Sequence, residues 1–170
     1  MYISAINKTT LLDYPNHLAS TLFLQGCNFL CPFCHNKDLI PSPNTFKEKS
    51  MHDMTDHVLS ILDKRSHLIE GVCISGGEPT LHKDLPEFVR LIKAMNLKIK
   101  LDTNGSNPAM LKSLLEEGLV DYVALDIKNS MDAYSKTCGK SMNFHAITES
   151  LQLLMDYPHE NFSYELRTTL

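Results

Sequence analysis

The sequence has no long hydrophobic run and no excess of basic residues. Its longest apolar stretches, such as 122–125, are far shorter than the roughly 20 residues of a membrane-spanning helix. Net charge is −4, with 16 lysines and arginines against 20 acidic residues, so we expect neither a nucleic-acid nor a membrane partner. The first ten residues lack the apolar centre of a signal peptide, which predicts a cytoplasmic protein.

Internal repeats and low-complexity segments are also absent. The chain has 170 residues, of which 43% are hydrophobic and 21% charged, as expected for one globular domain spanning 1–170. The most loop-like segment is 36–49, where Pro41 and Pro43 favour a surface excursion.

Strand-like and helix-like patterns alternate along the chain. We expect strands at 20–25, 72–75, 98–102, 122–127 and 163–168, and helices around 54–62, 85–95, 108–117 and 147–155. This alternation predicts an α/β fold in which about five βα units form a partial parallel barrel. Lys98 and Lys100 flank Ile99 in one predicted strand, which therefore has one wet face or end.

Several helix boundaries carry capping signals. Ser50 with Asp53 can form a capping box, and Asp84 is placed to cap the second helix. Asn107 precedes Pro108 at the start of the third helix, and Gly118 follows its end.

Five cysteines form the strongest chemical signal, because three of them lie within eight residues. Cys27, Cys31 and Cys34 form a C-x3-C-x2-C pattern directly after the first predicted strand. An odd number clustered in this way favours a metal site in a reducing compartment over a disulfide framework. Three thiolates on one loop can hold three irons of a 4Fe–4S cluster and leave the fourth iron open. The alternative is a zinc site with His35 as fourth ligand, although closed zinc sites usually draw ligands from two separated pairs.

Polar motifs follow the other predicted strands. They are Gly76-Gly77-Glu78-Pro79, Asp102-Thr103-Asn104-Gly105, Asp126-Ile127-Lys128 and Arg167-Thr168-Thr169. Each can be an ordinary turn or strand cap, and two aspartates can also form an acid–base pair. Because active sites in parallel α/β barrels lie at the carboxyl ends of the strands, we expect all four motifs to meet there.

These motifs together resemble the radical S-adenosylmethionine (SAM) superfamily. Within it, the chain is similar to the glycyl-radical-enzyme activases, and most similar to the anaerobic ribonucleoside-triphosphate reductase activating proteins. The narrower resemblance is carried by Leu11-Leu12-Asp13-Tyr14-Pro15, Gln25-Gly26-Cys27-Asn28-Phe29, Cys34-His35-Asn36 and the two aspartate motifs.

The resemblance implies cofactors and the residues that hold them. Cys27, Cys31 and Cys34 would bind a 4Fe–4S cluster. The remaining implied contacts with SAM come from Phe33, Cys34, His35, Gly76, Gly77, Glu78, Asp102, Asp126 and Lys128. In the activases, residues matching Asp102, Thr103 and Asp126 bind a monovalent cation beside SAM.

The implied activity is reductive cleavage of SAM, followed by removal of a hydrogen atom from a glycine of a partner enzyme. The implied partner is the large subunit of anaerobic ribonucleotide reductase, with a single-electron donor such as a flavodoxin. One alternative is a radical SAM enzyme that acts on a small molecule, similar to the deazapurine-forming synthases. The other is a non-catalytic zinc-binding protein.

Expectations for the rest of the chain are more local. We expect this chain to lack the sixth βα unit that is usual in the superfamily, which would leave the strand containing Tyr164 and Leu166 as an exposed edge that promotes association. Cys73 lies in an apolar strand and is expected to be buried and inert. Cys138 is expected to be a loop thiol, with a redox or partner-facing role as the alternative.

Overall fold

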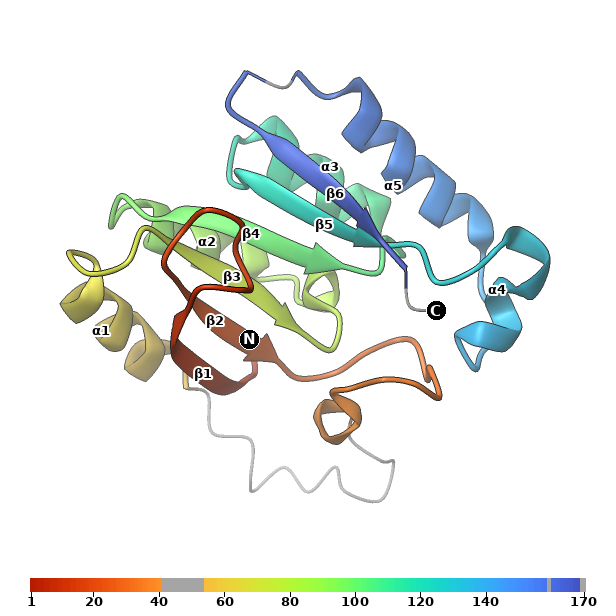
Figure 1. Ribbon diagram of the computed structural model, residues 1–170, viewed down its shortest axis with the longest axis horizontal. Coiled ribbons are helices and arrows are strands. Elements are labelled where there is room, and N and C mark those ends of the chain that lie inside the picture. Colours follow the sequence, from red (N-terminus) through yellow and green to blue (C-terminus); the bar gives the residue numbers. More distant parts are fainter. Residues whose placement is uncertain (41–53, 159, 169–170) are drawn as a thin grey trace.

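The computed structural model describes residues 1–40, 54–158 and 160–168. One six-stranded sheet runs through the molecule in the order β1-β2-β3-β4-β5-β6 (Figure 1). The strands are β1 (Ile3–Thr10), β2 (Ala19–Leu24), β3 (Gly71–Gly76), β4 (Lys98–Thr103), β5 (Tyr122–Asp126) and β6 (Ser163–Arg167). Strands β2 to β6 are parallel, and β1 pairs antiparallel with β2. The partial parallel barrel predicted from the sequence is therefore confirmed.

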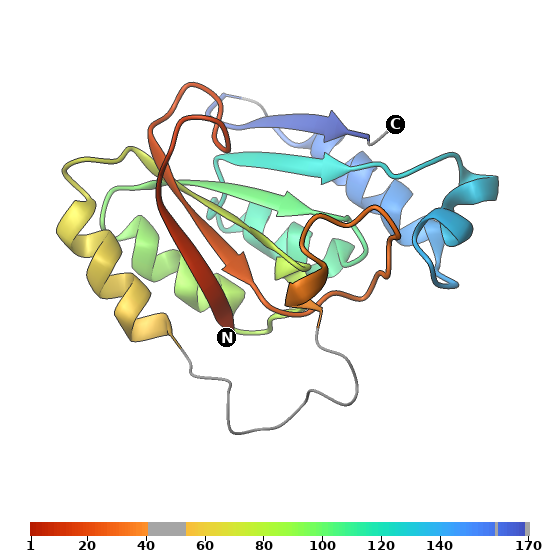
Figure 2. The same cartoon turned by 60° about the horizontal axis from the view of Figure 1, so that its bottom comes forward.

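Helices connect successive parallel strands and cover one face of the sheet (Figures 1 and 2). They are α1 (Thr55–Arg65), α2 (Leu85–Lys93), α3 (Pro108–Glu116), α4 (Met131–Thr137) and α5 (Phe144–Asp156), with short 3-10 turns η1 (Lys37–Leu39) and η2 (Pro79–Leu81). No helix in these described ranges is long and apolar enough to cross a membrane.

The alternation of side chains along each strand produces two different faces. Ile74, Leu101 and Val123 lie side by side in register on β3, β4 and β5 and are fully buried in the core beneath the helices. The residues that precede them, Cys73 and Lys100 among them, point to the opposite, concave face. Burial of the apolar face supplies the main driving force for the fold.

Two elements were not predicted from the sequence. In β1, only Ile3 and Thr10 are buried at either end, so the strand shows no continuous apolar pattern. Helix α4 has seven residues, of which only Tyr134 is buried. At the other edge of the sheet, Leu166 is 51% exposed whereas Tyr164 packs against the core.

The helix caps follow the predictions in part. The Asn107 side chain accepts a hydrogen bond from the Met110 amide at the start of α3, and Gly118 follows the helix with φ of +62°. Asp84 precedes α2 but makes no capping hydrogen bond, since its carboxylate pairs with the amino terminus of Met1. The predicted Ser50–Asp53 capping box lies outside the described residues.

The two lysines of β4 differ from one another. Lys98 is exposed at the start of the strand, as predicted for a wet end. Lys100 is only 2% exposed on the concave face, where its ammonium lies 2.5 Å from Asp102 and 3.7 Å from Glu165. The strand therefore has the predicted wet end at Lys98 and no wet face at Lys100, where two carboxylates neutralise the buried charge.

Candidate functional site

A cavity of about 380 Å³ opens where the carboxyl ends of the parallel strands meet. It collects every site residue predicted from the sequence. Those residues are Cys27, Cys31, Phe33, Cys34, His35, Gly76, Gly77, Glu78, Asp102, Thr103, Asp126 and Lys128. The predicted convergence of motifs from separate strands at one edge of the sheet is thus confirmed.

The cysteine loop leaves β2 through Gly26, whose φ of +93° is a conformation that favours glycine. The Gly26 amide donates to the carbonyl of Leu39 in η1, so the start of the cysteine loop is bound to the turn that follows the cysteines. Cys31 is buried, and Cys27 and Cys34 are half-buried at the cavity.

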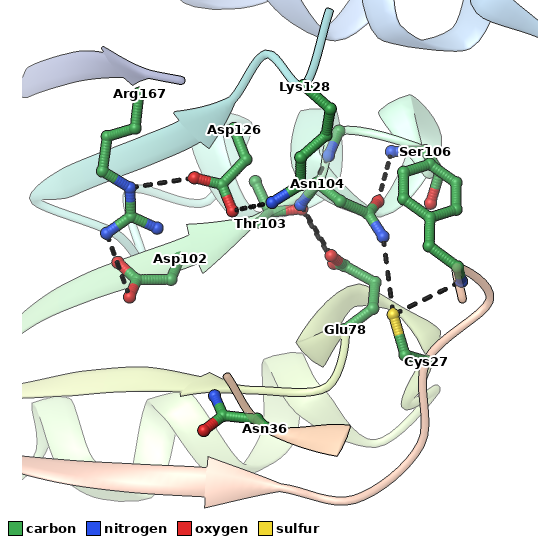
Figure 3. A network of polar contacts seen from close by, with 12 residues as sticks. Cys27, Asn36, Glu78, Asp102, Thr103, Asn104, Ser106, Asp126, Lys128 and Arg167 are labelled. Carbon is green, nitrogen blue, oxygen red and sulfur yellow. Dashed lines mark hydrogen bonds and ion pairs between the residues drawn. The ribbon is translucent and has the colours of Figure 1, made fainter. Parts of the chain in front are cut away.

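The Cys27 sulfur accepts two hydrogen bonds, one from within this loop and one from the residue that follows β4. The Phe29 amide donates at 3.4 Å and the Asn104 side-chain amide at 3.9 Å (Figure 3). Burial raises the pKa of Cys27 to about 11, and burial likewise raises the pKa of Cys31, against the opposing effect of Lys128. In the absence of a metal both thiols therefore keep their protons at neutral pH, and metal binding would release them.

The cysteines do not form a site for a single ion. Among the described residues, no three His, Cys, Asp or Glu side chains are placed to hold one metal ion. The zinc alternative, with Cys27, Cys31, Cys34 and His35 around one ion, thus has no support from the geometry. A 4Fe–4S cluster makes a different demand, since each cysteine sulfur binds a different iron.

Glu78 connects the ends of β3 and β4. Its side chain is fully buried and accepts hydrogen bonds from the Thr80 amide at 3.1 Å, the Thr103 hydroxyl at 2.7 Å and the Asn104 amide at 2.7 Å. Burial raises the pKa of Glu78, whereas these donors favour its charged form. With its oxygens engaged by the protein, Glu78 acts as a support for the cavity rim.

The two glycines before Glu78 have a packing role. A Cβ atom on Gly77 would lie 1.9 Å from the carbonyl oxygen of Gly26, and one on Gly76 would lie 2.3 Å from the amide nitrogen of Leu24. The missing side chains therefore allow β3 to approach the start of the cysteine loop. Both glycines also line the cavity, where the family resemblance implies contacts with SAM.

An ionic network connects the ends of β4, β5 and β6 (Figure 3). The Arg167 guanidinium lies 2.9 Å from Asp126 and 3.4 Å from Asp102, and Lys128 lies 2.8 Å from Asp126. Burial tends to lower the pKa of Arg167, but the two carboxylates more than offset this and raise it. The Thr103 hydroxyl donates to Glu78 and so turns away from the aspartates.

Sequence reasoning missed several residues that line the cavity. Asn36 donates to the Gly76 carbonyl at 3.2 Å, and Asn104 contacts both the cysteine loop and Glu78. Both belong to motifs that carried the family resemblance, so the signal was present but was not assigned to a role. Phe33 is half-buried and His35 exposed at the cavity mouth.

Cys138 lies in the turn that follows α4, as predicted for a loop thiol, but it is fully buried. Its thiol lies close to that of Cys31 in a small apolar cluster. The contact spans more than a hundred residues of sequence, and no local pattern indicates it. Cys73 is fully buried in β3, as predicted.

The sheet is mostly parallel, and a three-cysteine loop and polar strand ends surround one cavity at its edge. These are features of an enzyme that works with a bound cofactor. The pattern of the radical SAM superfamily matches residues 21–166, which is most of the chain. The chain therefore belongs to the radical SAM superfamily, whose enzymes use a 4Fe–4S cluster and SAM.

Relatives indicate the group within this superfamily. The chain is 31% identical over 170 residues to a protein of Methanocaldococcus jannaschii named as a glycyl-radical enzyme activating enzyme, covering 98% of this chain and 67% of that one. A second such protein from that organism is 29% identical, with 99% of this chain and 58% of the relative covered. The pyruvate formate-lyase-activating enzyme of Listeria monocytogenes is 36% identical over 114 residues, which are 63% of this chain and 45% of that enzyme.

Solved structures share the fold at low sequence identity. A structure of TYW1 with a lysine-pyruvate adduct bound has a TM-score of 0.61 at 16% identity, covering 89% of this chain and 55% of that one. A structure of anSMEcpe with bound AdoMet has a TM-score of 0.58 at 21% identity, covering 84% and 40%. These similarities establish the fold.

Proposed function

We propose that this chain is an activase that cleaves SAM reductively and removes a hydrogen atom from a glycine of a partner enzyme. The observation that carries this proposal is the convergence of the three-cysteine loop and four polar strand ends on one cavity. Relatives named for glycyl-radical enzyme activation support the choice of reaction. The chain spans about two thirds of the first of them and less of the others.

Cys27, Cys31 and Cys34 are the proposed cluster ligands. All three are free of disulfides and come from one loop that faces the cavity. When bound, the cluster and SAM together supply a 5′-deoxyadenosyl radical that can abstract an unactivated hydrogen atom. The protein excludes water around Cys31 and orients the loop through the contacts of Asn104 and Gly26.

The remaining cavity residues would hold SAM. Arg167 and Lys128 present positive charge beside the cavity, where a carboxylate of the ligand can bind. Phe33 and His35 lie on the cysteine loop, where their backbone and the Phe33 ring suit an adenine base. Glu78 contributes indirectly, by fixing Thr103 and Asn104.

The resemblance implies a monovalent cation at Asp102, Thr103 and Asp126, where this chain already holds a charged side chain. Arg167 bridges the two carboxylates, so the protein itself already supplies positive charge between them. A bound metal ion would have to share or displace this guanidinium.

The proposed protein substrate is a glycyl radical enzyme, and specifically the large subunit of anaerobic ribonucleotide reductase, with a flavodoxin as electron donor. Relatives named for glycyl-radical enzyme activation favour a protein substrate over the small-molecule alternative.

The test is anaerobic reconstitution with iron and sulfide, then reduction in the presence of SAM with and without the ribonucleotide reductase subunit. The expected products are 5′-deoxyadenosine and, with the partner present, the electron paramagnetic resonance (EPR) doublet of a glycyl radical. Cys31→Ala should abolish both, whereas Cys73→Ala, which also removes a buried thiol, should preserve both. A reconstituted protein that never forms 5′-deoxyadenosine would contradict the proposal. Cleavage of SAM without a glycyl radical would contradict the partner alone.

A further inference from the structure

The end of α4 docks directly onto the cysteine loop. The Leu30 amide, one residue before Cys31, donates to the carbonyl of Cys138 at 2.8 Å. The next residue, Gly139, has φ of +67°, and a Cβ there would lie 2.4 Å from the Leu30 carbonyl oxygen. Backbone contacts from both residues therefore fix the helix end against the loop, independently of the Cys138 side chain.

The Cys138 side chain lies in a small apolar cluster under this loop. The cluster consists of Phe29, Cys31, Tyr134, Cys138 and Ile147, all of them buried. Tyr134 fixes the other side of α4, because its hydroxyl accepts from the Lys128 amide and donates to the Asp126 carbonyl, each at 3.2 Å. Cys138 is thus held between the cysteine loop and the end of β5, with no exposure to solvent.

The thiols of Cys31 and Cys138 lie close together in this dry cluster. When Cys31 binds iron its sulfur carries no proton, so it can only accept a hydrogen bond, and the Cys138 thiol is the neighbouring group that can donate one. Since the carboxyl end of α4 is anchored by backbone contacts, the donor stays in place when the ligand changes.

We propose that Cys138 is a positioning residue that donates an S–H···S hydrogen bond to Cys31 and stabilises the reduced form of the cluster. The inference rests on the proposed function, in which Cys31 is a cluster ligand. One-electron reduction adds negative charge that is shared by the ligand sulfurs, so a donor to one of them favours the reduced state. Asn104 and the Phe29 amide donate to Cys27 in the same way.

The experiment is an EPR-monitored redox titration of the reconstituted protein without SAM. Cys138→Ala should lower the equilibrium constant for one-electron reduction several-fold; a tenfold decrease corresponds to about 59 mV. Cys138→Ser keeps a hydroxyl donor and should restore a potential at or above that of the wild type. The matched control is Cys73→Ala, because it also removes a fully buried thiol but one that lies in β3, away from the cysteine loop.

The outcomes separate this inference from the proposed function. A wild-type potential in Cys138→Ala, or an equal decrease in Cys73→Ala, would overturn the role of Cys138 while leaving the activase proposal intact. Loss of cluster iron from both Cys138→Ala and Cys138→Ser would also overturn it, because a hydrogen-bond donor is not required for ligation. If the wild-type chain itself binds no cluster, the proposed function fails and this inference fails with it.

Discussion

The two faces of the sheet use the same strands for different purposes. In β4, Leu101 points to the helices and is buried among apolar side chains, whereas its neighbours Lys100 and Asp102 point to the concave face and form an ion pair. The same alternation places Cys73 opposite Ile74 in β3. Residues that stabilise the core therefore alternate along each strand with residues of the concave face. The core and the functional site come together only at the carboxyl ends of the strands.

The largest loss of stability should follow from a substitution at the carboxyl end of a strand, where the core meets the functional site. Gly76→Ala should destabilise the protein by about 4 kcal/mol or more, because the new Cβ would lie 2.3 Å from a backbone atom of β2 at a positive φ of +123°. Urea denaturation monitored by circular dichroism measures the change.

Gly118→Ala is the matched control for that substitution. Gly118 also has positive φ, at +62°, but no atom lies within 4 Å of the added Cβ. We expect a cost of only about 1 kcal/mol from the backbone conformation alone. Equal effects at the two glycines would show that the close approach of β3 to β2 is unimportant for stability.

A substitution on the helix-facing side should have a smaller, purely structural effect. Leu101→Ala should reduce the free energy of unfolding by about 3 kcal/mol, since it leaves a cavity in the core. The control is Leu166→Ala in β6, where the side chain is 51% exposed and the expected loss is below about 1 kcal/mol. Once both variants are folded, SAM cleavage per loaded cluster should equal that of the wild type; a loss confined to Leu101→Ala would show that the two faces are coupled.

The sequence predicted the helix-facing side of the sheet well because its signal is local. Runs such as those of β3 and β5 are apolar over several consecutive residues, and α3 carries a capping asparagine and a first-turn proline. Strand β1 and helix α4 were missed because each buries only one or two side chains, so their formation depends on partners distant in sequence.

In the functional site too, features that depend on local sequence could be predicted, and features that depend on distant partners could not. Every predicted cavity residue belongs to a motif that is continuous in sequence, and the parallel topology brings the motifs together. Contacts between motifs could not be predicted. The burial of Lys100, the bridging position of Arg167 and the closeness of Cys138 to Cys31 each depend on the register and docking of separate elements.

The rate of alkylation should distinguish a thiol of the functional site from a thiol inside the sheet. Burial raises the pKa of Cys27 from 9.0 to about 11, so in the cluster-free protein its alkylation at pH 8 should be roughly a hundredfold slower than in the unfolded chain. Cys73, which is fully buried on β3, should react more slowly still. Peptide mass spectrometry after timed iodoacetamide treatment measures each rate separately.

The direction of the linked stability effect follows from the raised pKa. The folded chain keeps the Cys27 proton to higher pH than the unfolded chain, so this contribution to stability is complete below pH 9 and is lost as the pH rises towards about 11. An alkylation rate for Cys27 that reaches its plateau below pH 9 would contradict the buried environment assigned to this thiol.

The smallest expected effect concerns the monovalent cation. Because Arg167 already contacts both Asp102 and Asp126, replacing potassium by choline at constant ionic strength should change the affinity of the cluster-loaded wild type for SAM by less than about twofold. Arg167→Ala removes the guanidinium, so the two carboxylates should then recruit potassium, and SAM binding should become dependent on it.

The matched control is Arg90→Ala, which removes an exposed arginine paired with Glu117 far from the cavity. The measured quantity is the ratio of affinities in the two salts, which is insensitive to any direct loss of contact between Arg167 and SAM. A wild-type affinity that falls tenfold in choline would instead establish that a metal cation binds beside the guanidinium, and that the concave face needs more positive charge than its own side chains provide.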